Sequence, residues 1–138
     1  MKKRTIYITE FDMERLKKRL FESETIPERD KENLAELEQE LMRAEIVSPK
    51  EIPQDVITMN STVRLKYLDT EKEMIYTVVF PSDADVAQNK ISVLAPIGTA
   101  LIGYGVGDII TWKVPAGLRK LRVEEIIYQP EAAGHYDL

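Results

Sequence analysis

The stretch that most constrains the fold runs from Ile91 to Gly117 and carries no charged residue before Asp108. Such an apolar run belongs inside a folded domain. Its pattern predicts a strand that begins at Ile91, a short helix after Pro96 and a second strand from Ile109 to Val114. Between the helix and the second strand, glycines mark a turn in which φ can be positive. These glycines are Gly103, Gly105 and Gly107.

The amino-terminal third predicts an antiparallel hairpin of two short helices. Thr9 offers a hydroxyl N-cap, and an apolar stripe then extends the first helix over about residues 9–22. A second stripe continues through about Glu45 and predicts a short coiled coil. It consists of Leu34, Leu37, Leu41 and Ala44. We expect the two stripes to bury only each other.

After the prolines of 47–53 the apolar period changes from 3.6 to 2, as strands require. Runs at 63–68, 75–80 and 119–128 alternate as strands, and Glu124-Glu125 predicts a bulge in the last one. The sequence therefore predicts an α+β fold, with an antiparallel sheet and one short helix after the hairpin. The predicted domains are 1–47, the hairpin, and 48–138.

Composition excludes several classes of function. The 138 residues include no cysteine and one histidine, His135 near the end, which argues against thiolate catalysis and a cysteine-ligated metal. The net charge of −5 argues against a protein that binds a phosphate backbone. With no run of about 18 apolar residues and no apolar signal segment, we expect a cytoplasmic protein rather than a membrane protein.

Several motifs together resemble a known family. Pro96, the short apolar helix, Val106-Gly107-Asp108 and the Pro115-Ala116-Gly117 turn are similar to the carboxy-terminal domain of Gre-type transcription elongation factors. The segments 48–61 and 128–134 narrow the resemblance to the Rnk branch, small proteins named as regulators of nucleoside diphosphate kinase. The resemblance implies an FKBP-like fold for the sheet domain.

The resemblance also implies a partner, RNA polymerase. In the family, the loop before the short helix docks on rim helices of the polymerase large subunit, at the secondary channel. That loop corresponds here to Leu94, Ala95, Pro96 and Ile97. Leu94 and Ala95 stand where the family has an acidic residue and a serine, so we expect apolar docking with low salt sensitivity. Pro96 also suits the first turn of any helix.

The hairpin tip carries a second candidate site, formed by Glu24, Glu28, Asp30 and Glu32. Gre cleavage factors present acids at such a tip to hold magnesium during hydrolysis of backtracked RNA. Here a helix of about 14 residues reaches only about 20 Å, whereas the family's cleavage factors use arms about twice as long. We therefore expect the tip acids to be solvated or to contact the polymerase rim, without catalysis.

These features favour a non-catalytic polymerase regulator that competes with Gre factors, with no metal or cofactor and no sequence-specific nucleic acid binding. A Gre-like cleavage factor and a peptidyl-prolyl isomerase are the alternatives. The isomerase would need an aromatic pocket, but the chain has a single tryptophan, Trp112, and a core position suits that residue better. The tail 129–134 fits either a packed terminus or a binding strip.

Overall fold

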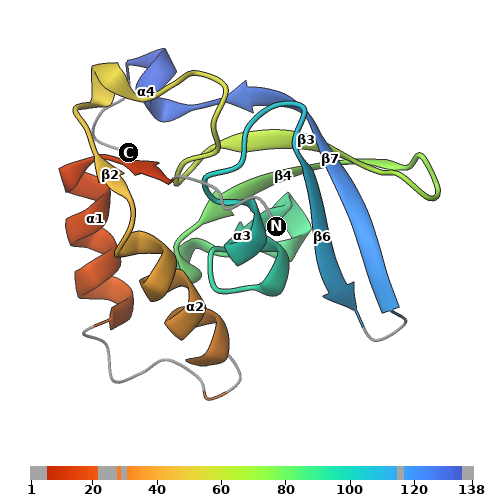
Figure 1. The fold of residues 1–138 in the computed structure, drawn as a ribbon, viewed down its shortest axis with the longest axis horizontal. Coiled ribbons are helices and arrows are strands. Elements are labelled where there is room, and N and C mark those ends of the chain that lie inside the picture. The colour runs from red at the N-terminus through yellow and green to blue at the C-terminus, as the bar shows by residue number, and fades with distance from the viewer. Residues whose placement is uncertain (1–5, 22–27, 29–30, 115–116, 135–138) are drawn as a thin grey trace.

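The computed structural model describes residues 6–21, 28, 31–114 and 117–134. It combines a five-stranded sheet with short helices, so the predicted α+β class is confirmed (Figure 1). The elements before the sheet are β1 (Tyr7–Ile8), α1 (Glu10–Leu16), the π-helix η1 (Lys17–Phe21), α2 (Lys31–Leu41), β2 (Glu45–Ile46) and η3 (Pro49–Glu51). The rest are β3 (Thr62–Tyr67), β4 (Glu73–Val79), η4 (Pro81–Asp83), η5 (Val86–Gln88), β5 (Lys90–Ser92), α3 (Pro96–Leu101), β6 (Ile109–Val114), β7 (Gly117–Tyr128) and α4 (Pro130–Ala133).

The strands lie in the order β5-β4-β3-β7-β6, and one pair departs from the antiparallel prediction. β5 runs parallel to β4, with Val79 opposite Ser92, whereas the other neighbours are antiparallel. The connection between the two strands contains the single turns η4 and η5. Through them the chain returns far enough for Lys90 of β5 to pair with Thr77 of β4. The expectation of a purely antiparallel sheet was therefore wrong, and the finer assignment to an FKBP-like topology stays a prediction.

The arm, as we call α1, η1 and α2 together, agrees only in part with the predicted hairpin. Thr9 caps α1 as expected, because its Oγ1 accepts the Asp12 backbone N–H at 3.1 Å. The last turns before the tip form the π-helix η1. α2 ends at Leu41, short of the predicted Glu45, because Glu45 and Ile46 pair with β1 as a parallel strand.

The apolar stripes of the arm do not bury only each other, so that expectation was wrong. Leu16, Leu20, Leu37 and Leu41 belong to the same buried cluster as the sheet residues Val63 and Leu65 and the α3 residue Leu101. In Figure 1, α1 and α2 stand beside the sheet, and α3 lies against it. Burial of each such side chain contributes about 1.5–3 kcal/mol. The arm is thus built into one core with the rest of the chain, and the division into 1–47 and 48–138 stays a prediction.

The stretch that begins at Ile91 folds in the predicted order of strand, helix, turn and strand. Gly103 and Gly107 have φ of 86° and 91°, the left-handed conformation that glycine adopts without a steric cost. The predicted bulge in β7 is also confirmed, since Arg64 lies opposite Glu125 while Leu65 lies opposite Val123. The turn at 115–116 lies outside the described residues.

Candidate functional site

The predicted docking loop, Leu94–Ile97, comprises the end of the connection from β5 and the first two residues of α3, and it is only partly exposed. Leu94 is 1% exposed and belongs to the core, whereas Ala95 and Ile97 are half-buried. Pro96 opens α3 with Ala95 as its N-cap residue in an extended conformation. The loop can therefore offer the side chains of Ala95 and Ile97 to a partner, while Leu94 fixes the loop to the molecule.

Several short contacts fix this loop against the end of β5. The Thr99 hydroxyl donates to the Val93 carbonyl at 2.6 Å, and the Leu94 N–H donates to Ser92 Oγ at 3.0 Å. A Cβ added to Gly98 would lie 2.0 Å from the Ser92 carbonyl oxygen, so α3 approaches the strand as closely as only glycine permits. The loop is thus held in one conformation by the elements around it.

The arm contacts this same loop through Asn33, which the sequence analysis did not identify. Asn33 Nδ2 donates to the Leu94 carbonyl oxygen at 3.0 Å, and α2 packs against α3. Asn33 lies only two residues into α2, on the side of the tip. No sequence pattern marks a single amide that bonds a backbone carbonyl 61 residues away, so periodicity could not have found it.

The end of the first arm helix is held by an aromatic ring that the sequence analysis also missed. The guanidinium carbons of Arg15 and Arg19 lie 4.9 and 4.8 Å from the centroid of the Phe80 ring, within the range of a cation–π interaction. Phe80 is 1% exposed and directly follows β4. Thus Phe80 and Leu94 hold the two arm helices at neighbouring strand ends.

The acidic tip is exposed where it is described. Glu28 and Glu32 are both exposed, and Glu28 forms an ion pair of 3.0 Å with Lys31. Glu24 and Asp30 lie outside the described residues. Among the residues that the structure describes, no three acidic or histidine side chains come together as metal ligands would. The described part of the tip is thus a solvated surface that a basic partner could contact.

At its base, the arm buries an acid that we had not singled out. Asp12 is 2% exposed, and its carboxylate accepts a hydrogen bond from Arg15. Burial raises the pKa of Asp12 to about 6, although Arg15 opposes this shift, and the negative charge of Glu131 raises the pKa further. The pKa of Asp12 therefore lies closer to neutral pH than that of an ordinary aspartate.

The tail is a packed terminus rather than a free strip. Glu131, 7% exposed, accepts a hydrogen bond of 2.7 Å from the Thr58 hydroxyl. Gln129 Nε2 donates to the carbonyl oxygens of Pro53 and Val56 at 2.8 and 2.7 Å. The resemblance had marked this segment, but only the structure shows that its polar side chains point inward. The contacts of Gln129 and Glu131 thus fasten the segment after β7 to residues 53–58.

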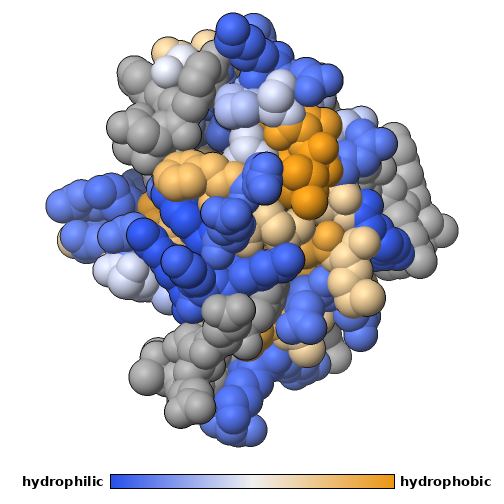
Figure 2. All heavy atoms as spheres, turned by 90° about the vertical axis from the view of Figure 1, so that its left-hand side faces the viewer, coloured by the Kyte–Doolittle hydropathy of each residue, from blue (hydrophilic) through white to orange (hydrophobic). Residues whose placement is uncertain are grey.

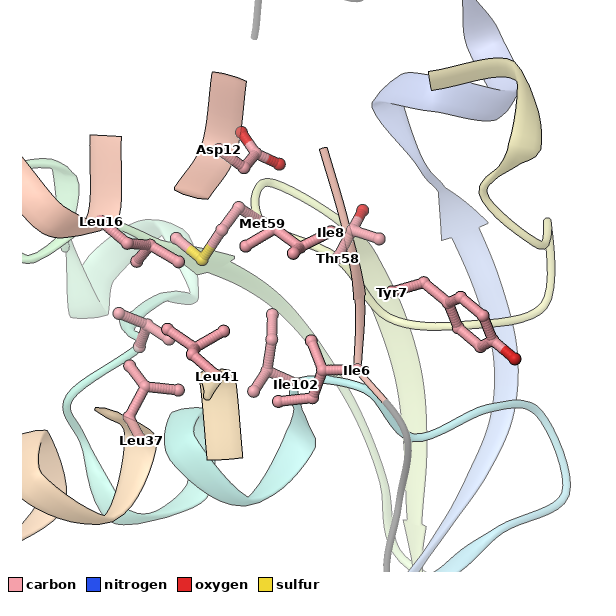
Figure 3. Close-up of a pocket in the computed structure, with 11 residues that line it drawn as sticks. Ile6, Tyr7, Ile8, Asp12, Leu16, Leu37, Leu41, Thr58, Met59 and Ile102 are labelled. Carbon is pink, nitrogen blue, oxygen red and sulfur yellow. The ribbon is translucent and has the colours of Figure 1, made fainter. Parts of the chain in front are cut away.

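A small cavity lies between the base of the arm and the sheet. Its volume is about 10 Å³, roughly the room for one water molecule. Figure 3 shows Leu16, Leu37, Leu41 and Met59 gathered on one side, with the ring of Tyr7 pointing away. The polar groups among its lining residues include Asp12 and Thr58. The cavity is too small for a substrate, so it offers no candidate active site.

The outer face of the arm is mostly hydrophilic. Figure 2 views this side of the molecule and shows scattered hydrophobic side chains among polar ones. Exposed apolar residues on this side include Phe11 of α1, Met42 after α2 and Ile46 of β2, at 42, 81 and 57%. Along α2, Glu32, Glu36 and Glu38 are exposed and give this helix a negative outer surface. The outer surface of α2 is thus acidic, whereas η1 exposes the basic residues Lys17, Lys18 and Arg19.

Comparison with known proteins gives the family. Residues 51–128 match the model "Transcription elongation factor, GreA/GreB, C-term", and residues 4–47 match "Rnk N-terminus". The regulator of nucleoside diphosphate kinase from Escherichia coli K12 is 46% identical over 101 residues, which cover 72% of this chain and 74% of the relative. The transcription elongation factor GreA of Syntrophotalea carbinolica is 38% identical over 95 residues, 69% of this chain and 60% of the relative.

Solved structures agree with these relatives. A prokaryotic transcription elongation factor GreA/GreB from Nitrosomonas europaea superposes with a TM-score of 0.76 at 42% identity, over 91% of this chain and all of that one. Gfh1 of Thermus aquaticus gives a TM-score of 0.50 at 28% identity, over 90% of this chain and 99% of its own. Among the described residues, no helix is long and apolar enough to cross a membrane. With both family models matched, the chain belongs to the Rnk branch of the GreA/GreB family of transcription elongation factors.

Proposed function

We propose that this protein binds RNA polymerase at the rim of the secondary channel and competes there with Gre factors without stimulating transcript cleavage. Its membership of the Gre family and the partly exposed Ala95 and Ile97 of the docking loop support this role. The partner would place the protein in the cytoplasm. The relative from Escherichia coli is named as a regulator of nucleoside diphosphate kinase. We propose that any such effect of this protein is indirect and acts through transcription.

One observation supports competition more than cleavage, namely that the arm is short and seated on its own domain. α2 has 11 residues, which correspond to a length of about 16 Å. Asn33 bonds the docking loop, and a chain of five residues spans at most about 18 Å, so Glu28 stays within that distance of the contact. Magnesium ligation requires oxygen atoms within about 2.1 Å of the ion. An arm held so close to the docking loop supports obstruction of the channel entrance rather than delivery of a ligand into it.

The test measures binding of the fluorescently labelled protein to core RNA polymerase and its displacement by a Gre factor. We expect saturable binding, competitive displacement and weak dependence on salt at the docking loop, because that contact would be apolar. Ala95→Arg places a charge in the loop and should weaken binding. Ala87→Arg makes the same change at an exposed position of η5 and serves as the matched control. Absence of binding, or binding that a Gre factor leaves unchanged, would overturn the proposal.

A further inference from the structure

We propose that Asn33 is a positioning residue that joins the arm to the docking loop, so that the start of α2 and the loop meet the polymerase as one rigid surface. The inference rests on the proposed function and extends it, because it assigns the arm a part in binding. The contacts that support it follow the one parallel strand pair of the five-stranded sheet, β4 and β5. Since β4 and β5 run in the same direction, with Val79 opposite Ser92, their carboxyl ends lie at the same end of the sheet.

Both halves of the arm contact the residues that follow these strand ends, and they do so through the parts of the arm nearest its tip. Arg19, within η1, places its guanidinium 4.8 Å from the ring of Phe80, the residue that follows β4. Asn33, near the start of α2, donates to the carbonyl of Leu94, two residues after β5. A hairpin attached only at its base could swing about that base. Together with the buried Leu20 and Leu37, these two contacts hold the described part of the arm in place against the rest of the molecule.

The Asn33 contact is the more specific of the two attachments. The amide meets a backbone carbonyl, whose position is set by the short bonds around Val93, Leu94 and Thr99. Leu34 and Leu37 pack into the core behind it and hold α2 against the sheet. Glu32 directly precedes Asn33 and is exposed, so the Asn33 contact fixes the backbone from which this acid extends into solvent. The structure thus places the apolar docking loop beside the start of α2, where the exposed Lys31 and Glu32 extend the surface that would face the polymerase.

The first experiment tests rigidity without the polymerase. The chain has no cysteine, so Ala35→Cys in α2 and Ala87→Cys in η5, both exposed, allow a pair of spin labels to be attached cleanly. Pulsed electron paramagnetic resonance should give a narrow distance distribution in this background. Asn33→Ala should broaden it, whereas Gln39→Ala, which removes an exposed amide from the same helix, should leave it unchanged. An unchanged distribution in Asn33→Ala would overturn the positioning role.

The second experiment measures the affinity of unlabelled variants for core polymerase. Loss of one neutral hydrogen bond corresponds to a weakening of about two- to tenfold, which we expect for Asn33→Ala but not for Gln39→Ala. Asn33→Gln retains an amide donor and should recover part of the affinity. If Asn33→Ala broadens the distances yet binds and competes as the wild type does, the coupling is wrong while the proposed function stands. If the wild type fails to bind polymerase, both are overturned.

Discussion

The two ends of the arm are attached to the rest of the molecule by different chemistry. At the base, Asp12 is buried with Arg15, and Glu131 of the tail lies close enough to influence its pKa. At the tip side, a neutral amide and cation–π contacts hold the helices. Buried ionisable groups couple an attachment to pH, whereas amide and aromatic contacts do not. We therefore expect pH to act on the arm through Asp12 at its base, and to leave the neutral Asn33 contact on the tip side unaffected.

The largest expected effect follows from removal of the aromatic ring at the tip side. Phe80→Ala empties a buried site and deprives Arg15 and Arg19 of their ring, so we expect the free energy of unfolding to fall by about 3–5 kcal/mol. Phe80→Leu keeps most of the volume and should cost about 1–2 kcal/mol. Urea denaturation measures both. No loss in Phe80→Leu would show that the ring and its cations contribute nothing beyond volume, whereas equal losses in the two variants would show that the retained volume does not matter.

The next effect concerns the base and depends on pH. The pKa of Asp12 is raised from 3.8 to about 6, so the folded state holds a proton that the unfolded state has already released between these values. Stability should therefore fall as pH rises from about 4 to 6, by up to about 3 kcal/mol from this group. Asp12→Asn should flatten this slope in urea denaturation across that window. Glu14→Gln, an exposed acid of the same helix, is the control; an identical slope in Asp12→Asn and the wild type would contradict the account.

A smaller effect tests the start of α1, next to the buried acid. Thr9→Ala removes the hydroxyl that accepts the Asp12 backbone N–H and should lower the free energy of unfolding by about 1 kcal/mol. Thr9→Ser keeps the cap and should lose much less. Thermal denaturation of the three proteins gives the comparison. A loss as large in the serine variant would point to the methyl group rather than the cap.

The smallest effect is expected far from both attachments, on the outer face of the sheet. Glu73 and Glu125 flank Arg64 at 2.9 and 3.2 Å, but all three side chains are substantially exposed. Exposed ion pairs contribute about 0–1 kcal/mol, so Glu73→Gln should change stability by no more than this. Denaturation at low and high salt measures it. A larger loss would mean that this face is held more tightly than its exposure indicates.

The parts of the fold that could be predicted from the sequence are those that depend on residues close together in the chain. The cap at Thr9, the short helix after Pro96 and the bulge near Glu124 each depend on neighbouring residues, and each was confirmed. The parallel direction of β5 depends instead on the path of a connection with two single turns. The early end of α2 depends on pairing of Glu45 with a strand 38 residues earlier. Neither leaves a periodic signal.

The residues of the candidate site likewise include some that sequence motifs identified and others that only the structure revealed. The docking loop and the tip acids were found from motifs, although Leu94 proves to be buried and Glu24 and Asp30 lie outside the described residues. Their binding roles stay predictions. Asn33 and Phe80 were missed, because a single amide or ring acquires its contact only when distant segments fold together. The packed tail shows this as well, since Glu131 finds its partner Thr58 across 73 residues.

In the function that we propose, the arm occupies the channel entrance but does not deliver its acidic side chains to the catalytic magnesium of the polymerase. The most direct measurement incubates a backtracked transcription complex with this protein, with a Gre factor, and with both together, and follows the length of the RNA. The account predicts no shortened RNA with this protein alone, and slower cleavage by the Gre factor as its concentration rises. Shortened RNA with this protein alone would contradict it.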